Sequence, residues 1–368
     1  MKLSFTKASL AAGINIVSKA VPAKTTMTIL ECILIDASAG EIKLTANDME
    51  LGIETVVEGQ ILEKGRIAIE AKLFSEIIRK LPDSEILIES DDKYNVSITC
   101  EKADFKITGK EADEFSYLPM IEKDDYISVS QFTLKEMIRQ TIFSIAAGDV
   151  NKLMTGELFE VNENELKITS LDGHRISIRK VRLRDSYAPQ KVVVPGKTLT
   201  EISKILSGEA DKDVLIFFGP NHILFEFDRT LVVSRLIEGE YFRVQQMLSG
   251  DYETKMTINK KDFLDSIDRS VLLIRENDKK PIILNLQDQM LEMSLTSMMG
   301  TMKEEILVNK QGKDIMIGFN PKFLIDALRV IDDETVDIYM VNSKAPCFIR
   351  DEEENYIYLI LPVNFNRV

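Results

Sequence analysis

Apolar residues recur at helical spacing in three segments of the chain, and these segments lie at a regular interval. The shared apolar faces consist of Leu73, Ile77 and Ile78, then Ile202, Ile205 and Leu206, then Phe323, Ala327 and Leu328. A lysine stands near the start of each segment, at positions 72, 197 and 322, so 125 residues separate neighbouring copies. Each segment leads through an acidic turn into ILIES, VLIFF or VDIYM, runs rich in the residue types that strands prefer. The pattern predicts a helix followed by a strand, three times over.

A second predicted helix precedes each of these segments. The three candidates cover residues 10–21, 134–146 and 262–274, and each follows a short strand-like run, KLSF, ISVS or KMTI. Two further runs come after each helix: ECILIDAS with EIKLTAND, GELFEVN with ELKITSLD, and PIILNLQ with MLEMSLTS. Runs of this length, separated by short polar turns, favour antiparallel sheet.

The order strand, helix, strands, helix, strands therefore occurs three times, which indicates an internal repeat. Polarity rises and the order restarts near residues 122–126 and 249–253. We expect an α+β fold of three repeated domains, each with two helices packed on antiparallel sheet. The expected domains are residues 1–124 (N-terminal), 125–251 (central) and 252–368 (C-terminal). A chance likeness between generic α+β segments is the alternative, and lysines that stay in register disfavour it.

Composition narrows the class of protein. The 368 residues suit two or three domains, and no run reaches the roughly 18 apolar residues of a membrane span. The N-terminus reads as a strand and a helix rather than a leader, so we expect a cytoplasmic protein.

Cys32, Cys100 and Cys347 are far apart and odd in number, which disfavours a disulfide framework. With only two histidines and no metal-ligand spacing, we expect no metal and no cofactor.

Charge is distributed unevenly along the sequence. The net charge of −14 alone argues against nucleic acid. Yet the windows around the six predicted helices hold 19 basic and 10 acidic residues, so the rest of the chain carries −23. Basic helices that neutralise phosphates would bind DNA independently of its sequence. The helix preference of lysine is an alternative explanation, but glutamate shares that preference and is scarcer in these windows.

The candidates for facing double-stranded DNA are the basic residues of the helical windows. No zinc finger, helix-turn-helix or aromatic–basic tract is present, so backbone contact is expected rather than base readout. The candidates are Lys7, Lys19, Lys24, Lys72, Arg79, Lys80, Lys135, Arg139, Lys152, Lys197, Lys204, Arg269 and Arg275. Some of them, such as Arg269 and Arg275, have neighbouring acids with which they could instead pair.

The segment Asp172-Gly173-His174-Arg175 looks most like chemistry. Asp172 and His174 could share a face at a strand end, so a hydrolase or transferase using Asp172, His174 and Arg175 is one alternative function. Such a dyad needs a nucleophile or a bound substrate, and no hydrolase, phosphate-loop, dinucleotide or zinc-protease motif is present. The structural interpretation is a turn at Gly173 whose backbone N–H groups bond to Asp172. Residues 47–50 and 296–298 occupy the corresponding places in the other repeats, which favours that interpretation.

Over its whole length the chain resembles the beta subunit of bacterial DNA polymerase III, the sliding clamp family. The segments that carry the resemblance are TILECILIDA with LTANDMELGIE, TGELFEV with LDGHRIS, LIEGEY, and YLILPV. The resemblance implies a non-catalytic, ring-shaped homodimer of three-domain clamp subunits. Helices would line a central hole around duplex DNA, and the ring would tether the replicative polymerase. A cytoplasmic scaffold without DNA contact is a further alternative.

The resemblance also implies a pocket where the polymerase catalytic subunit, the clamp loader, repair polymerases and mismatch-repair proteins insert a short apolar peptide. The matching positions are Met154, Leu171, Gly173, His174, Arg175, Ile176, Phe242, Gln246, Met247, Leu359, Leu361, Pro362 and Val363. Phe242, Gln246 and the tail from residue 364 to 368 depart from the family pattern. Because Pro362 cannot donate a ladder hydrogen bond, we expect the apolar run 356–363 to wall a groove instead of extending a sheet. A tail that only seals the core is the alternative.

For the homodimer we expect the first domain of one subunit to meet the third domain of the other. The candidate interface residues are Phe105, Ile107, Leu272, Leu273 and Arg275. Phe105 and Ile107 lie on a predicted strand whose edge could pair across subunits. The alternative places the four apolar residues in domain cores.

Overall fold

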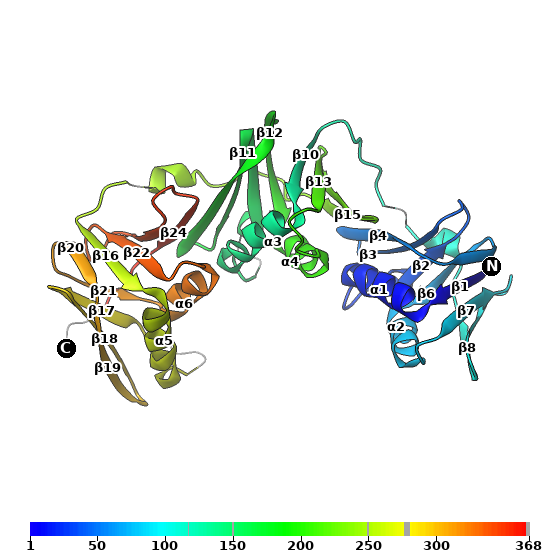
Figure 1. Ribbon diagram of the computed structural model, residues 1–368, viewed down its shortest axis with the longest axis horizontal. Coiled ribbons are helices and arrows are strands. Elements are labelled where there is room, and N and C mark those ends of the chain that lie inside the picture. Colours follow the sequence, from blue (N-terminus) through cyan, green and yellow to red (C-terminus); the bar gives the residue numbers. More distant parts are fainter. Residues whose placement is uncertain (117, 149–150, 249, 276–279, 366–368) are drawn as a thin grey trace. The chain divides into compact units, whose positions relative to one another are not determined.

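The helices of the computed structural model lie in each of the three expected repeats (Figure 1). The structure describes residues 1–116, 118–148, 151–248, 250–275 and 280–365. Parts of two helical windows (149–150 and 276–279), one residue of the second linker (249) and the end of the tail (366–368) lie outside them. The described α-helices are α1 (Lys7–Val17), α2 (Ala71–Lys80), α3 (Gln131–Arg139), α4 (Gly196–Ile205), α5 (Lys260–Ser270) and α6 (Pro321–Val330).

Polar side chains at strand ends set where the helices begin. Thr6 caps α1, Asn259 caps α5 and Asn320 caps α6, each by accepting a hydrogen bond from a backbone N–H in the first turn. Such caps satisfy donors that have no partner within the helix. The in-register lysines at 72, 197 and 322 are each the second residue of a helix and are exposed. The 125-residue period therefore marks equivalent helix starts.

The boundaries predicted for the first helix of each repeat were wrong by several residues. The helices α1, α3 and α5 begin two or three residues before the predicted ranges 10–21, 134–146 and 262–274. Each also ends early and passes into a short 3-10 turn. These turns are η1 (Ser18–Ala20), η4 (Ile142–Ser144) and η7 (Val271–Leu273). Apolar spacing extends through such turns, so it overstates the length of the α-helix.

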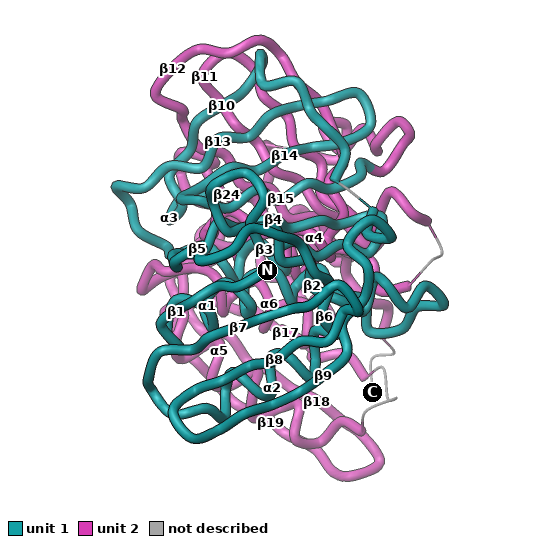
Figure 2. Tube along the Cα trace, turned by 90° about the vertical axis from the view of Figure 1, so that its right-hand side faces the viewer, with its two compact units in different colours: residues 1–134, 201–236 teal, residues 135–200, 237–368 magenta. Residues whose placement is uncertain are grey.

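Two compact units make up the chain, one of residues 1–134 with 201–236 and the other of residues 135–200 with 237–368 (Figure 2). The first unit contains a five-stranded and an eight-stranded antiparallel sheet. The five-stranded sheet has the order β5 (Gln60–Glu63), β1 (Lys2–Thr6), β7 (Glu85–Ser90), β8 (Asn95–Cys100), β9 (Ala103–Thr108). The eight-stranded sheet has the order β10 (Tyr126–Ser130), β13 (Asp213–Phe218), β14 (His222–Phe227), β15 (Thr230–Arg235), β4 (Leu51–Val57), β3 (Ile42–Asn47), β2 (Cys32–Asp36), β6 (Arg66–Glu70).

The second unit contains a seven-stranded and a four-stranded antiparallel sheet. The seven-stranded sheet has the order β11 (Gly156–Leu171), β12 (Arg175–Pro195), β24 (Tyr356–Ile360), β23 (Cys347–Arg350), β22 (Thr335–Met340), β16 (Thr254–Asn259), β20 (Asn309–Gly312). The four-stranded sheet has the order β19 (Gly300–Leu307), β18 (Met290–Ser297), β17 (Ile282–Gln287), β21 (Ile315–Phe319). In each unit the larger sheet therefore crosses the boundary between two repeats, through the β4–β15 pair and the β12–β24 pair.

One expected turn proved to be part of a strand. The runs 156–162 and 165–172 were predicted as separate strands, yet the structure has the single strand β11 there, with register shifts on both sides of Glu163. Glu163 has φ +52°, so the polar stretch makes a local irregularity in the ladder instead of a reversal. The partner strand β12 is correspondingly long.

Apolar helix faces and sheet faces form the cores. In the C-terminal repeat, Phe263 of α5 and Leu328 of α6 are completely buried in one cluster with residues of β17 and β18. In the N-terminal repeat, Gly13 lets α1 approach β4, because a Cβ at this position would lie 2.3 Å from the side chain of Val57. No α-helix in the described part of the chain is long and apolar enough to cross a membrane.

Candidate partner-binding pocket and basic helices

The turn between β11 and β12 is fixed by one carboxylate. Asp172 Oδ1 accepts hydrogen bonds from the backbone N–H groups of His174 (3.0 Å) and Arg175 (3.2 Å). Gly173 has φ +86°, a conformation that costs little only for glycine. These contacts confirm the structural interpretation of the segment. The donors to Asp172 are the backbone N–H groups and the Arg175 guanidinium, and not the imidazole of His174, so the two side chains do not form a catalytic dyad.

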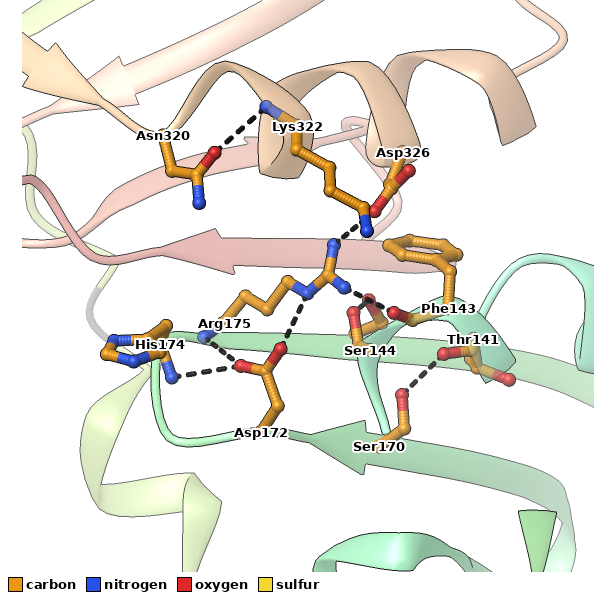
Figure 3. Close-up of polar contacts among 11 residues, drawn as sticks. Thr141, Phe143, Ser144, Ser170, Asp172, His174, Arg175, Asn320, Lys322 and Asp326 are labelled. Carbon is orange, nitrogen blue, oxygen red and sulfur yellow. Dashed lines mark hydrogen bonds and ion pairs between the residues drawn. The ribbon is translucent and has the colours of Figure 1, made fainter. Parts of the chain in front are cut away.

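Arg175 is held from three sides by residues far apart in the sequence (Figure 3). Its guanidinium donates to Asp172 (3.0 Å) and to Asp326 of α6 (2.7 Å), and to the carbonyl oxygen of Phe143. The guanidinium carbon also lies 4.5 Å from the ring centroid of Phe323, within cation–π range. The residue is 8% exposed. Arg175 therefore positions the turn, rather than offering a free guanidinium to a peptide.

Beneath the turn lies a layer of buried polar side chains, several of which appear in Figure 3. Ser144 and Ser177 share a hydrogen bond of 2.5 Å, and the Ser170 hydroxyl donates to the carbonyl oxygen of Thr141 (2.6 Å). Each of these hydroxyls thus has a partner. Buried polar groups need such partners to offset their loss of water, and the resulting layer ties η4 to β11 and β12.

Not every buried polar atom here has a partner: Gln140 Oε1, Thr169 Oγ1 and both carboxyl oxygens of Glu157 have none among the described residues. The side chain of Glu157 is completely buried. Burial raises the pKa of Glu157 to about 8, because a charged carboxylate is costly in an apolar environment. At neutral pH the group is therefore mostly protonated.

Five apolar residues of the predicted pocket lie in or against one cluster. Leu171, Ile176 and Leu359 are buried together, and Met154 and Leu361 pack against the same cluster half-buried. Strand register explains this, because Leu171 pairs with Ile176 and Ile176 pairs with Leu359 across β11, β12 and β24.

The tail does not behave wholly as expected. Through Ile360 it forms the strand β24, paired with both β12 and β23, so the prediction that the run walls a groove instead of extending a sheet was wrong for residues 356–360. Beyond this strand, the N–H of Leu361 bonds to the carbonyl oxygen of His174 (2.9 Å). The N–H of Val363 then bonds to Gly318 (2.8 Å). Only residues 361–363, all half-buried, leave the sheet beside the turn.

The pocket residues that lie between β15 and β16 are exposed. Phe242 is 37% exposed and Met247 48% exposed, and Gln246 is exposed as well. Of these, Phe242 contacts buried Tyr241 edge to face, with ring centroids 5.8 Å apart. A cavity of ≈ 400 Å³ borders the same apolar cluster at Leu248 and on the neighbouring strands.

Several residues that shape this site were missed from the sequence. Phe143, Phe323 and Asp326 hold Arg175, and Phe323 also stacks on His174 with ring centroids 6.0 Å apart. Two of them belong to a helix that the periodicity did find, but a period says nothing about contacts with another repeat. In the described parts of the chain, no group of three His, Cys, Asp or Glu side chains could hold a metal ion.

The candidate DNA-facing residues fall into two groups. Some have internal partners: Lys7 donates to the carbonyl oxygen of Leu81, Arg139 pairs with Glu136 and Asp332, Lys204 with Glu201, and Arg269 with Glu304. Lys135 and Lys197 also have interactions. Lys24, Lys72, Arg79, Lys80, Lys152 and Arg275 are exposed, and Lys19 is half-buried. These seven have no ion pair within the described ranges. Lys24 and Lys152 lie in a loop and a 3-10 turn rather than on α-helices.

The candidate interface residues lie at the edge of one sheet and at the end of one helix. Phe105 (39% exposed) and Ile107 are on β9, an edge strand of the five-stranded sheet. Leu272 of η7 is 73% exposed, so it does not belong to a core in this chain. Arg275 follows η7 and is exposed, whereas Leu273 is half-buried against the core of the C-terminal repeat.

Three α+β repeats with antiparallel sheets and exposed basic helix residues define a clamp-type protein. Models of the DNA polymerase III beta subunit match the chain three times: the N-terminal domain at residues 1–119, the central domain at 128–242 and the C-terminal domain at 245–364. The chain belongs to the family of the DNA polymerase III beta subunit, the beta sliding clamp.

Relatives match along almost the whole chain. The beta sliding clamp of Staphylococcus epidermidis is 34% identical over 361 residues, which cover 95% of this chain and 96% of the relative. A DNA polymerase III beta subunit structure from Eubacterium rectale is 64% identical, with a TM-score of 0.97 over 99% of this chain and 100% of that one. The sliding clamp structure from Bacillus subtilis is 33% identical, with a TM-score of 0.96 and full coverage of both chains. The expected family and fold class are confirmed.

Proposed function

We propose that two copies of this chain close head to tail into a ring around duplex DNA and hold the replicative polymerase on its template. The chain is a sliding clamp, a non-catalytic subunit that gives DNA polymerase III its processivity. The observation that carries the DNA-binding part is local. The α2 helix of an acidic chain presents Lys72, Arg79 and Lys80 to solvent, without an ion pair among the described residues.

The contact with DNA is to the phosphate backbone. Exposed lysine and arginine side chains neutralise phosphates, release counterions and carry no base preference. Lys24, Lys80 and Lys152 are exposed members of this set. Reversing these three charges should weaken binding similarly on every duplex sequence and mostly at low salt. Unchanged binding of the triple variant would count against the assignment.

The ring closes where β9 of one subunit meets the C-terminal repeat of the other. An exposed edge strand offers unpaired backbone groups, and two such heterologous contacts related by a two-fold axis close a dimer. Phe105, Ile107, Leu272, Leu273 and Arg275 supply the side chains. The domain boundaries at residues 124 and 251 remain part of this proposal.

The dimer proposal is tested by Leu272→Ala with Leu273→Ala in sedimentation and thermal melting. A variant that melts normally but sediments as a monomer is the expected result, because Leu272 is largely exposed in the single chain. Leu62→Ala on the opposite edge strand β5 is the matched control, since Leu62 is 55% exposed. A stable dimer of the double variant overturns this interface, and a melted monomer indicates that Leu273 serves the core.

The cluster around Leu171, Ile176 and Leu361 is the docking site for partner peptides. It combines a buried apolar floor with the exposed side chains of His174 and Met247 at its rim, as peptide sites tend to. The proposed partners are the polymerase catalytic subunit, the clamp loader, repair polymerases and mismatch-repair proteins, all in the cytoplasm.

Removal of residues 361–368 tests this docking site. It deletes the segment that leaves the sheet at Leu361, while β24 itself stays paired on both sides. We expect the truncated ring to remain dimeric and to lose binding of polymerase-derived peptides in a polarisation assay. Undiminished peptide affinity would place the site elsewhere.

A further inference from the structure

The chain builds the Asp172 turn a second time, between β3 and β4. Asp48 Oδ1 accepts hydrogen bonds from the backbone N–H groups of Glu50 (3.0 Å) and Leu51 (2.7 Å), as Asp172 does for the two residues that follow Gly173. The residue after Asp48 again has a positive φ, +75° at Met49. A methionine in this conformation is strained, so the turn is held by its surroundings.

Each of the two turns is joined to the end of a neighbouring strand by the same kind of backbone hydrogen bond. The N–H of Arg235, at the end of β15, bonds to the carbonyl oxygen of Glu50 (2.8 Å), as the N–H of Leu361 bonds to His174 (2.9 Å). The strand pairs correspond as well, because β15 lies antiparallel to β4 as β24 does to β12. Glu50 therefore occupies the position in the first unit that His174 occupies in the second.

A segment near the end of the first repeat, which includes Leu118, closes a cavity over the Asp48 turn. Leu118 packs so tightly on Gly52 that a Cβ there would lie 2.0 Å from its methyl carbon. The cavity has a volume of ≈ 220 Å³, and its walls include Met49, Leu118 and Val233. At ~30 Å³ for one water, this volume corresponds to about seven waters, enough for one aliphatic or aromatic side chain.

The charge at the mouth of this cavity differs from that at the other turn. Glu50 is exposed, and its carboxylate has no partner among the described residues. Met49 beside it is 59% exposed. The equivalents of Glu50 and Leu51 in the second unit are His174 and Arg175, neither of which carries a negative charge. The first-unit cavity therefore combines a lining that is mostly apolar, with Asn47, Ser116 and His222 among it, and an unpaired carboxylate at its entrance.

We propose that the Asp48 turn is a second docking site, which takes an extended peptide with an aliphatic side chain in the cavity and a basic residue beside Glu50. Charge complementarity selects this occupant, because Glu50 attracts a cation and repels an acid at the residue next to the anchor. The site lies wholly in the first unit and shares no residue with the cluster around Leu171. A partner segment could therefore use it independently of the site proposed above.

The test is a titration of the full-length protein, labelled with ¹³C at the methionine methyl groups, followed by NMR. Met49 reports on the new site and Met247 on the other, and each signal is assigned by its Leu variant. The probes are the peptides acetyl-Ser-Leu-Lys-Ser-amide and acetyl-Ser-Leu-Glu-Ser-amide. We expect the lysine peptide to shift the Met49 methyl saturably and to bind about two- to five-fold more tightly than the glutamate peptide, as one exposed ion pair allows.

Two variants separate the charge from the cavity. Glu50→Gln should bring the affinity ratio of the two peptides to about one, whereas Glu58→Gln, just beyond the far end of β4, should leave it unchanged. Gly52→Ala should weaken both peptides, because the added methyl must displace Leu118, and a melting curve checks that this variant folds. A Met49 signal that neither peptide moves up to its solubility limit overturns the proposal, as does a ratio that survives Glu50→Gln. Movement of Met247 alone overturns this site and leaves the other proposed site standing.

Discussion

The α2 helix of the first repeat and the α5 helix of the third each carry three basic residues, but they hold them differently. On α2, Lys72, Arg79 and Lys80 point their charges into solvent, without ion pairs within the described ranges. The Glu70 carboxylate at the start of α2 accepts hydrogen bonds from the backbone N–H groups of Lys72 and Leu73, and not from a basic side chain. The charge of α2 is therefore available to an external anion.

On α5, each of the three cations has an internal partner. Lys260 donates to the carbonyl oxygen of Ile331 (2.6 Å), and Lys261 pairs with Asp265 (2.7 Å). Arg269 pairs with Glu304 of β19 (2.7 Å). The neighbouring helix α6 repeats this arrangement, with Arg329 paired to Asp268 (3.1 Å). Equal numbers of cations in two repeats therefore do not imply equal contributions to DNA binding.

The largest expected effect is a difference in DNA binding between a variant without the exposed cations of α2 and a variant without the paired cations of α5 and α6. The α2 variant carries Lys72→Gln, Arg79→Gln and Lys80→Gln, and the matched variant carries Lys261→Gln, Arg269→Gln and Arg329→Gln. Each removed phosphate contact lowers the salt slope of log K by about 0.9. A dimeric ring would lose six such cations in the α2 variant. Its affinity for a short duplex should therefore fall by up to about 10³-fold less than that of the native protein when salt is raised from about 50 to about 200 mM. The matched variant should change little.

Fluorescence anisotropy across a salt series measures both slopes. Circular dichroism checks that each variant keeps its fold. Equal losses in the two variants would show that the ion pairs of α5 and α6 do not withhold their cations from DNA.

Glu157 is the extreme case of the comparison, a carboxyl group that is completely buried and has no hydrogen-bond partner for its oxygens among the described residues. Its pKa rises from 4.5 to about 8 because it is buried. Below pH 4.5 both the folded and the unfolded states are protonated. Between these pH values only the unfolded state ionises, so stability falls by about 1.4 kcal/mol per pH unit as pH rises, and then stays low.

The variant Glu157→Gln does not titrate, so its stability relative to the native protein should increase from pH 5 to pH 8. At pH 7 the part of the difference due to titration should be about 3 kcal/mol. Urea unfolding at several pH values measures it, with Glu165→Gln, at an exposed site on the same strand, as the control. Parallel stability profiles for the native protein and Glu157→Gln would refute the buried, neutral carboxyl.

Releasing a paired cation should have the smallest effect. Glu304→Gln removes the partner of Arg269, so the salt slope of DNA binding should increase by less than one contact per subunit. Hydrogen bonding to Arg269 lowers the pKa of Glu304. The pair therefore stabilises the protein above the unfolded-state pKa, and this contribution is lost as pH falls through the folded-state pKa.

The stability loss of Glu304→Gln should be below about 1 kcal/mol at pH 7, since both side chains are partly exposed. It should shrink towards zero in acid. Thermal melting across pH measures this dependence, and a loss that grows in acid would contradict the assigned direction.

The distance along the chain between two interacting residues decides whether their interaction could be predicted from the sequence. The helices and their 125-residue period were found because apolar residues such as Ile77 and Ile78 recur within one turn or two. The prediction was wrong for Leu73, which is 43% exposed, because Phe74 occupies the buried face instead. The start of α1 was misplaced because its cap, Thr6, is also the last residue of a strand. The pairing of Arg269 with Glu304 was open, because the partner lies on a strand 35 residues away.

The site shows the same limit. The cluster of Leu171, Ile176 and Leu359 was placed through family resemblance, and the strand register accounts for it physically. The sequence placed Arg175 in the pocket but gave no sign of its partner Asp326, which lies 151 residues away in sequence. Periodicity and motifs report on neighbours in the chain, whereas Asp326 and Glu304, which bind Arg175 and Arg269, lie far from them in the sequence.

The central claim is that the chain encircles DNA, and retention on closed and open DNA tests it most directly. The protein is loaded by a clamp loader, the partner proposed above, onto nicked circular DNA and passed through a sizing column in high salt, which screens phosphate contacts. The account predicts that the ring stays with the circle and is released once a restriction enzyme linearises it. Release from the circle at the same rate as from the linear duplex would contradict a topological link.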